Sequence, residues 1–439
     1  MKPTAFILSI LAPATSLFVL SDTMAAVQTD IVGPAGSEQF GATVTVLPNG
    51  NFVVTDPIYD APGPIAAVGR VYLYNGKTLA LINTMTGTTA NDVIGIGGVT
   101  VLANGDYVVV SPDWNNGTGA VTRCSATSGC PATISAANSL VGSAGTPGVG
   151  QAVQALPNGN YVVQSWNWNN QIGAVTWCSG TSSCVGAVST ANSLVGSTSG
   201  DMVGAYSVIP LANGNYVVQS SAWSNGAATY AGAITPCSGT AVCAGTVSPA
   251  NSLGGSSSSE SIGSYGITVL TNGGYVVNSP YWDNGAISDA GAATFCNATS
   301  GCIGTISATN SLIGSTADDH VGITSFALSN GNYVTATSDW HNGALVNAGA
   351  ATFGNGTTGR VGPITSANSL VGMTAYESVG SNITALTNGN YVVSTPFWDN
   401  PVGPINNAGA ATWCSGTSGC TGSVTAANSM TGPSADDSV

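Results

Sequence analysis

One short motif recurs seven times along the chain and limits the fold more than any other feature of the sequence. The copies read LPNGNFVV at Leu47, LANGDYVV at Leu102, LPNGNYVV at Leu156, LANGNYVV at Leu211, LTNGGYVV at Leu270, LSNGNYVT at Leu328 and LTNGNYVV at Leu386. Asn-Gly between two alternating apolar runs is a strong hairpin signal, because both central residues of a type I′ turn need positive φ. Each copy therefore predicts two antiparallel strands.

A second pair of apolar runs follows each hairpin, for example GAATFC at 291–296 and GTIS at 304–307. We expect these runs to be the third and fourth strands of a four-stranded sheet. Seven such units without a helical period predict an all-β fold, a seven-bladed β-propeller of four-stranded antiparallel blades, because an open stack would leave two large faces bare. The propeller is predicted as a single domain over 27–439, with blades starting near residues 41, 96, 150, 204, 263, 322 and 380.

The ten cysteines occur in pairs six residues apart. The pairs are Cys124 and Cys130, Cys178 and Cys184, Cys237 and Cys243, Cys296 and Cys302, and Cys414 and Cys420. The sixth copy lacks both, with Gly354 and Arg360 in their places, and the first copy lacks both as well. Joint presence and absence predicts five disulfides across the hairpin between the third and fourth strands. A metal site would need four converging ligands, and a redox site would usually show Cys-x-x-Cys.

The first 26 residues have the features of a secretory signal peptide, with Lys2, an apolar run over 5–20 and small residues suited to cleavage near Ala26. Secretion agrees with the cysteine usage and predicts a secreted or cell-surface protein. No later segment is long and apolar enough to insert into a membrane. Five Lys and Arg against nineteen Asp and Glu, a formal net charge of −14, argue against nucleic acid as a partner.

The first copy reads FGATVTVLPNGNFVVTDPIYD and then GRVYLYNG, from Phe40 to Gly76. This stretch resembles the integrin-type FG-GAP repeat, and the resemblance extends in degenerate form over about 31–439. It implies a β-propeller. FG-GAP hairpins often carry an Asp-rich calcium loop, but here Asn158–Gly159–Asn160 and its equivalents lack those carboxylates, so we expect no metal and no other cofactor. The chain is also similar to uncharacterised repeat modules of bacterial secreted, adhesin-like proteins.

An aromatic residue follows the second strand of every copy. These residues are Tyr59, Trp114, Trp168, Trp223, Trp282, Trp340 and Trp398, with Asp283 and Asp399 next to two of them. Flat aromatic faces beside carboxylates could stack on and hydrogen-bond to sugar rings, which makes the tryptophans and both aspartates candidate ligand-binding residues. The alternative is packing between blades, with the Asp side chains capping their own turns. Recurrence in every copy favours packing.

Most linkers before a first strand carry an acidic residue: Glu38, Asp92, Asp201, Glu260, Asp319, Glu377 and Asp437. A cation site would explain them, but one or two carboxylates per blade fall short of the ligands that calcium takes. Hydrogen bonds to linker backbone N–H groups are the simpler interpretation.

No nucleophile elbow or two-histidine metal motif occurs, and His320 and His341 both fall in the sixth copy. We therefore expect a non-catalytic binding or adhesion module that recognises a glycan or a surface protein through its loops. Two alternatives stay open: a purely structural spacer, and a hydrolase or lyase using the loops. The segment 430–439 is a near-copy of 31–41 and could mediate self-association.

Overall fold

The structure, a computed structural model, describes residues 29–63, 65–143, 145–401 and 405–437. The predicted signal peptide lies outside these residues. In the described part of the chain the strands form seven sheets, one for each copy of the Asn-Gly motif. We number the repeats one to seven after these sheets.

Three antiparallel strands begin every sheet, and they confirm the predicted hairpins. The first strands are β1 (Thr43–Val46), β5 (Val99–Val101), β9 (Ala152–Ala155), β14 (Ser207–Pro210), β19 (Ile267–Val269), β24 (Thr324–Ala327) and β29 (Asn382–Ala385). The second strands are β2 (Phe52–Asp56), β6 (Tyr107–Ser111), β10 (Tyr161–Ser165), β15 (Tyr216–Ser220), β20 (Tyr275–Ser279), β25 (Tyr333–Thr337) and β30 (Tyr391–Thr395). The third strands are β3 (Arg70–Tyr74), β7 (Ala120–Cys124), β11 (Ala174–Cys178), β16 (Ala233–Cys237), β21 (Ala292–Cys296), β26 (Ala350–Gly354) and β31 (Ala410–Cys414).

The fourth strand is not the one predicted. In repeats two to seven the antiparallel neighbour of the third strand is a two-residue strand further along: β8 (Leu140–Val141), β13 (Leu194–Val195), β18 (Leu253–Gly254), β23 (Leu312–Ile313), β28 (Leu370–Val371) and β33 (Met430–Thr431). The run expected to be the fourth strand crosses instead to the preceding sheet. There it pairs in parallel with that sheet's fourth strand, as β12 (Gly186–Ala187), β17 (Gly245–Thr246), β22 (Gly304–Thr305), β27 (Gly362–Pro363) and β32 (Gly422–Ser423). We call these five donor strands.

The first repeat differs from the others. Its sheet closes with β4 (Leu81–Thr86), which pairs antiparallel with β3 over the whole length of β3. In repeats two and three the loop after the second strand contains short helical turns, α1 (Trp114–Gly117) and α2 (Trp168–Gln171), each interrupted by two asparagines with left-handed backbone. The first sheet is therefore completed by a strand of its own repeat.

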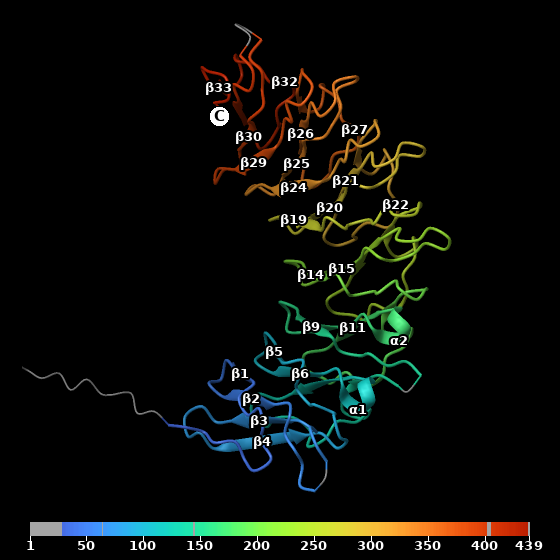
Figure 1. Cartoon of the computed structure of the whole chain (residues 1–439), viewed down its shortest axis with the longest axis vertical. Helices are drawn as coiled ribbons and strands as arrows, with labels where there is room; N and C mark the ends of the chain where they lie inside the picture. Colours follow the sequence, from blue (N-terminus) through green and yellow to red (C-terminus); the bar gives the residue numbers. More distant parts are fainter. Residues whose placement is uncertain (1–28, 64, 144, 402–404, 438–439) are drawn as a thin grey trace, which may run out of the picture.

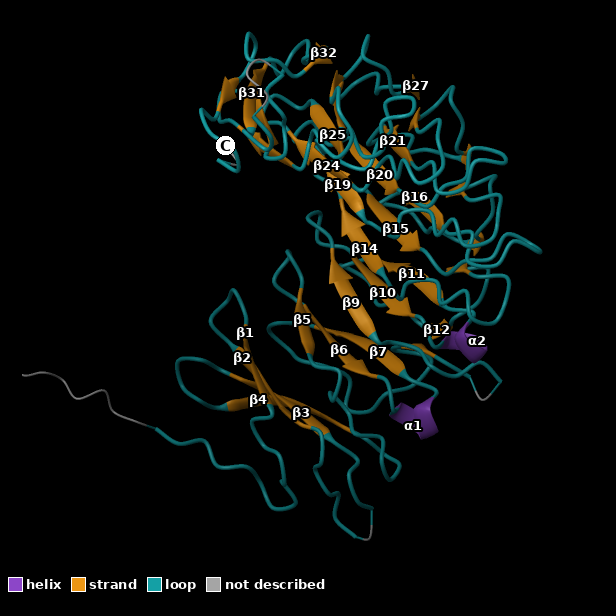
Figure 2. Ribbon diagram, turned by 45° about the horizontal axis from the view of Figure 1, so that its top comes forward, coloured by secondary structure: helices purple, strands orange, loops and turns teal. Residues whose placement is uncertain are grey.

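The predicted closed ring is not formed. The sheets follow one another along an open arc, with the first and seventh sheets at its two ends (Figure 1). First strands such as β9, β14 and β19 lie on the concave side, and the donor strands β22 and β27 lie on the convex side (Figures 1 and 2). Repeats three to seven are each joined to the preceding sheet by a donor strand and the first sheet is completed by its own β4, so among the described residues no strand pairing joins the seventh sheet to the first.

The core lies between successive sheets rather than within one of them. Leu270 and Val276 of the fifth repeat pack in one cluster with Tyr333 and Trp340 of the sixth, and all four side chains are buried. Equivalent clusters join the other neighbours. Removing apolar surface from water therefore stabilises each repeat only together with its neighbours, as in other repeat proteins.

The five predicted disulfides are present, with Cα atoms 4.4 to 5.6 Å apart. Their position differs from the prediction, because each bond closes a tight loop at the end of a third strand instead of joining two paired strands, as between Cys296 and Cys302. Five disulfides indicate that the folded chain belongs in an oxidising, extracellular environment. None of the helices in the described residues has the length and apolar character needed to cross a membrane.

Candidate ligand-binding surface on the loop face

The recurrent aromatic residues are buried between sheets. Tyr59, Trp168, Trp223, Trp282, Trp340 and Trp398 are 5% exposed or less, and Trp114 is half-buried. Trp223 lies against Gly254 of its own fourth strand, where an added methyl group would come within 3.1 Å of the ring. Buried indoles offer no free face to a sugar, so their placement supports the packing interpretation.

The two candidate aspartates cap their own loops. Asp283 Oδ1 accepts a hydrogen bond from the Asp289 N–H at 3.0 Å, and Asp399 Oδ1 accepts one from the Asn407 N–H at 2.8 Å. Both bonds lie within the connection between a second and a third strand. The residues predicted to bind a ligand therefore lie at the junctions between repeats. Most of them are buried or cap their own loops, so they stabilise the loops.

The linker carboxylates bridge neighbouring repeats through backbone N–H groups. Asp201 is fully buried; one of its oxygens accepts from Ser197 and Thr198 in its own linker, and the other accepts from Ser224 in the adjacent loop at 2.9 Å. Asp92 and Asp319 make the same three types of contact. Burial raises the pKa of Glu260 and of Glu377, and backbone hydrogen bonds partly offset this rise. These contacts are the hydrogen bonds to backbone N–H groups that the sequence suggested for the linker carboxylates.

The segment 31–41 and the start of its near-copy, 430–431, each pack on the sheet of their own repeat. Phe40 packs edge-on against Tyr72, with ring centroids 5.2 Å apart, and the Asp60 N–H donates to the Gly36 carbonyl. At the other end, Met430 and Thr431 form β33 on the seventh sheet.

A different set of aromatic residues is exposed on the loop face, by which we mean the end of the sheets where the connections to the third strands and to the next first strands emerge. Six exposed rings lie there, all in repeats four to seven: Tyr206, Tyr230, Tyr265, Tyr281, Tyr376 and Phe397. These positions are not aromatic in every repeat. The sequence signal that marks them is therefore their variation between copies, whereas the recurrent aromatic positions are the buried ones.

Two of these tyrosines meet at the junction of repeats five and six. The hydroxyls of Tyr265 and Tyr281 are 2.9 Å apart, and their rings are edge to face with centroids separated by 5.5 Å. Tyr281 also lies edge to face with His320 at 6.0 Å. The hydrogen bond to Tyr265 is the main cause that raises the pKa of Tyr281. The pair therefore presents two hydroxyls and two aromatic surfaces.

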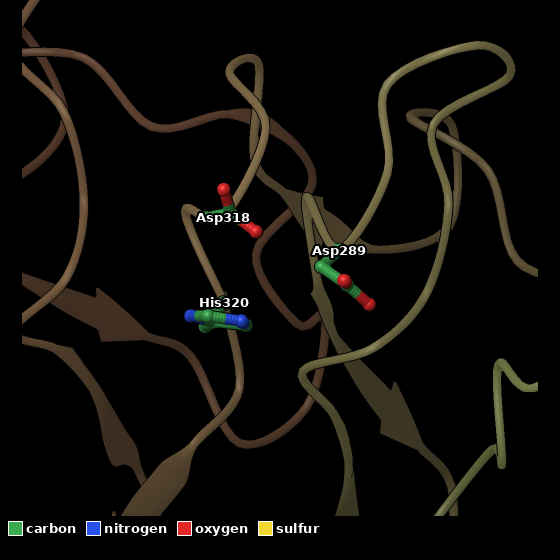
Figure 3. A group of neighbouring side chains, drawn as sticks. All are labelled: Asp289, Asp318 and His320. Carbon is green, nitrogen blue, oxygen red and sulfur yellow. The ribbon is translucent and has the colours of Figure 1, made fainter.

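Three titratable side chains lie beside this pair: Asp289, from the loop after β20, and Asp318 and His320, from the linker before β24 (Figure 3). One ligand atom from each lies within 4.8 Å of the others, which is compact enough for a divalent cation. His320 Nδ1 contacts Asp339 Oδ2 at 3.2 Å. Partial burial raises the pKa of Asp289, Asp283 and Asp318 raise it further, and His320 opposes the rise. The site concentrates negative charge.

The backbone that presents these three side chains is common to the repeats. Asp289, Asp318 and His320 have φ of 50°, 63° and 47°. At the preceding junction the equivalent residues Tyr230, Ser259 and Ser261 have 55°, 70° and 44°, with matching hydrogen bonds between loop and linker. Left-handed backbone is uncommon for residues other than glycine, so this conformation is a property of the junction. The junction of repeats five and six therefore differs from the preceding junction in its side chains and not in its backbone.

The sequence matches the family model DUF5650, which describes a repeat of unknown function. The model matches residues 101–151, 155–205, 210–264, 269–323, 327–381 and 385–439, more than half of the chain. The chain belongs to this family. The six matched DUF5650 repeats correspond to repeats two to seven, and the self-completed first sheet falls outside them.

Comparison with curated proteins gave no match. Among solved structures, a catalytically inactive virginiamycin B lyase from Staphylococcus aureus with quinupristin is 9% identical, with 80% of this chain and 89% of the lyase covered and a TM-score of 0.30. A streptogramin B lyase structure is 10% identical, with coverages of 80% and 88% and a TM-score of 0.29. Dihydro-heme d1 dehydrogenase NirN is 11% identical, with coverages of 87% and 65% and a TM-score of 0.31.

Proposed function

We propose that this DUF5650 repeat protein is a secreted or cell-surface, non-catalytic binding module that recognises a glycan through the loop face of repeats four to seven. One observation carries the proposal: the exposed tyrosines gather on that face in one half of the array, and Tyr265 and Tyr281 stand next to His320, Asp289 and Asp318. Exposed rings with hydroxyl and carboxylate neighbours can stack on a sugar and bond its hydroxyls. An adhesive role and kinship with FG-GAP proteins belong to the same proposal.

The negative charge of the loop face restricts the class of ligand that it can bind. Asp289 acts electrostatically on Tyr281, Asp283 and Asp318 act on Asp289, and Asp339 contacts His320 beside the same ring, while the chain has a formal net charge of −14. Sulfated, phosphorylated or carboxylated glycans would be repelled. A neutral or amino sugar is the class that fits.

The test is a glycan array probed with the mature protein and three variants. Tyr265→Ala and Tyr281→Ala should each abolish binding to the neutral or amino-sugar spots. Trp413→Ala is the matched control, because Trp413 is also an exposed aromatic residue, at 55% against 47% for Tyr265 and 37% for Tyr281, but lies on a third strand away from the loop face. All three variants should melt within about 2 °C of the wild type, since exposed side chains contribute little to stability.

Either of two results would contradict the proposal. If no spot binds the wild type, or if binding survives both tyrosine changes, the loop face does not recognise glycans. The spacer alternative would then be preferred, because the regular donor-strand junctions already provide an elongated scaffold without any ligand.

A further inference from the structure

The exposed edge of the seventh sheet has the form of an unfilled junction. In sheets two to six the outer edge of the fourth strand is covered by a donor strand from the following repeat. In the seventh sheet β33 pairs with β31, and no described residue pairs with its other edge. Edge strands with unpaired backbone groups are templates for another strand.

The exposed fractions of equivalent side chains show which residues of the seventh sheet a further donor strand would cover. The leucines that begin the fourth strands, Leu140, Leu194, Leu253, Leu312 and Leu370, are 1% exposed or less. Met430 occupies the same position in β33 and is 69% exposed. Trp413 on the neighbouring strand is 55% exposed, whereas its equivalent Phe353 lies beneath Gly419 of the next cysteine loop, where an added methyl group would come within 2.4 Å of it.

The backbone of this edge repeats the acceptor pattern of the filled junctions. Gly422 donates to the carbonyls of Ser366 and Ser369, and Val424 donates to Val371, at 2.8 to 3.2 Å. The equivalent carbonyls one repeat later belong to Ala426, Ser429 and Thr431. The surface beside them is hollowed by a volume of about 860 Å³ lined in part by Trp398, Val424 and Ala426.

A second contact of each junction is also left open. The Asn of each Asn-Gly turn donates its side-chain N–H to a carbonyl in the next repeat's cysteine loop, or in the equivalent cysteine-free loop of repeat six, at 2.6 to 2.9 Å, in six successive copies: Asn49, Asn104, Asn158, Asn213, Asn272 and Asn330. Asn388 is the seventh copy. In the described residues no further cysteine loop follows it.

We infer that the outer face of the seventh sheet is a docking surface for a further repeat of the same family, one whose donor strand is free. An intact second copy of this chain does not meet that condition, because β12, β17, β22, β27 and β32 are all engaged and the Ala132 carbonyl of repeat two already accepts from Thr86 of the first sheet. The occupant is thus an uncapped repeat that brings a glycine at left-handed φ followed by a short strand. This inference is independent of the proposed glycan binding.

Joining a copy of residues 322–379 after Val439 supplies such a repeat in the full chain. The sixth repeat is suited because it has no cysteines and has Leu370 where repeat seven has Met430, so Met430 stays unique. Oxidation of Met430 by hydrogen peroxide, followed by mass spectrometry of its peptide, should slow by more than about tenfold when β33 is covered. Buried Met85 should resist oxidation in both proteins.

The matched control changes only the donor strand of the added repeat. Gly362→Pro in the added copy removes the donated N–H and cannot adopt the φ of 87°, so Met430 should again oxidise at the rate seen without the extension. A second extension with residues 263–321 brings the Cys296–Cys302 disulfide, whose formation reports that the added repeat has folded. If that bond forms and Met430 is still oxidised at the original rate, the inference is wrong. Concentration-dependent dimers of the unextended chain in light scattering would likewise contradict it, by showing that a second copy covers the face.

Discussion

At the scale of single residues, the buried carboxylates of the linkers are the most informative feature. Glu260 and Glu377 are buried, and Oε2 of each accepts backbone N–H hydrogen bonds, but burial nonetheless raises the pKa of each above its ordinary value of 4.5. A raised pKa means that the folded protein favours the protonated form. The contribution of each group to stability is therefore fully present below the ordinary pKa and is lost as the pH rises through the pKa of the folded state.

The variant Glu260→Gln should accordingly weaken the pH dependence of stability. The amide keeps an oxygen that can accept from Ser256 and Ser257 but does not ionise, so the loss of stability between pH 4 and pH 7 should be smaller than in the wild type. Chemical denaturation at both pH values measures this difference. Glu38→Gln, at an exposed linker position, is the control and should leave the profile unchanged. Identical profiles for wild type and Glu260→Gln would contradict the prediction.

The sequence predicted which loops would carry the candidate site but not which of their residues would form it. The sequence indicated the loops between second and third strands, and the exposed tyrosines do lie on that face. It could not separate Trp282, which is buried, from its neighbour Tyr281, which is exposed, because both sit between the same two strands. Which of two adjacent rings turns inward depends on the next sheet, and that sheet belongs to a different repeat. Asp289, Asp318 and His320 come from separate loops, so their proximity is likewise a property of the folded chain.

At the scale of structural elements, the Asn-Gly hairpins were predictable and the donor strands were not. A two-residue strand such as β22 has no periodicity to recognise, and nothing local in the sequence shows whether it pairs with its own repeat or with the preceding one. The physical marker is the glycine that begins each donor strand. Gly304 has a φ of 94°, and its N–H donates to the carbonyls of Pro249 and Ser252.

Replacing this glycine tests the role of the donor strand. Gly304→Ala should destabilise the protein by about 1–2 kcal/mol, because alanine at left-handed φ is strained while the space around the position is open. Gly145→Ala is the matched control, since its surroundings are equally open and its φ is not left-handed, and it should have little effect. Thermal unfolding compares the two. Equal melting temperatures would show that donor-strand geometry is unimportant.

The contribution of the disulfide loops to the stability of the protein can also be measured. The sixth repeat builds the same sheet without cysteines, and Tyr333 fills the space beside Gly354, where an added methyl group would come within 2.0 Å of its ring. The double variant Cys296→Ala, Cys302→Ala should therefore fold and lose about 2 kcal/mol, the value expected for a loop of this length. Denaturant titration gives the loss, and the absence of a folded protein would show that the loop is needed for the sheet to form.

At the scale of the whole molecule, the two ends of the array are not equivalent. The first sheet completes itself with β4, while in the part of the chain that the structure describes one edge of β33 in the seventh sheet has no pairing strand. Self-similarity in the sequence predicted the number of units, but it could not predict closure, since closure depends on the angle between successive sheets and on what meets at the ends. An open array has a further consequence: stability is shared between neighbours, so a broken junction divides the molecule.

Gly245→Pro should divide it between the third and fourth sheets. The substitution removes the N–H that donates to Thr190 and Ser193, and proline cannot adopt the φ of 105°, so the junction should lose about 3 kcal/mol or more. Scanning calorimetry should then resolve two transitions, because the sheets on either side of the junction no longer unfold together. Thr246→Pro is the matched control: Pro363 occupies the equivalent position in β27, where the ladder needs no N–H, and this variant should unfold like the wild type. A single transition for Gly245→Pro would contradict the prediction, by showing that the apolar core between the third and fourth sheets is enough to keep both halves unfolding together.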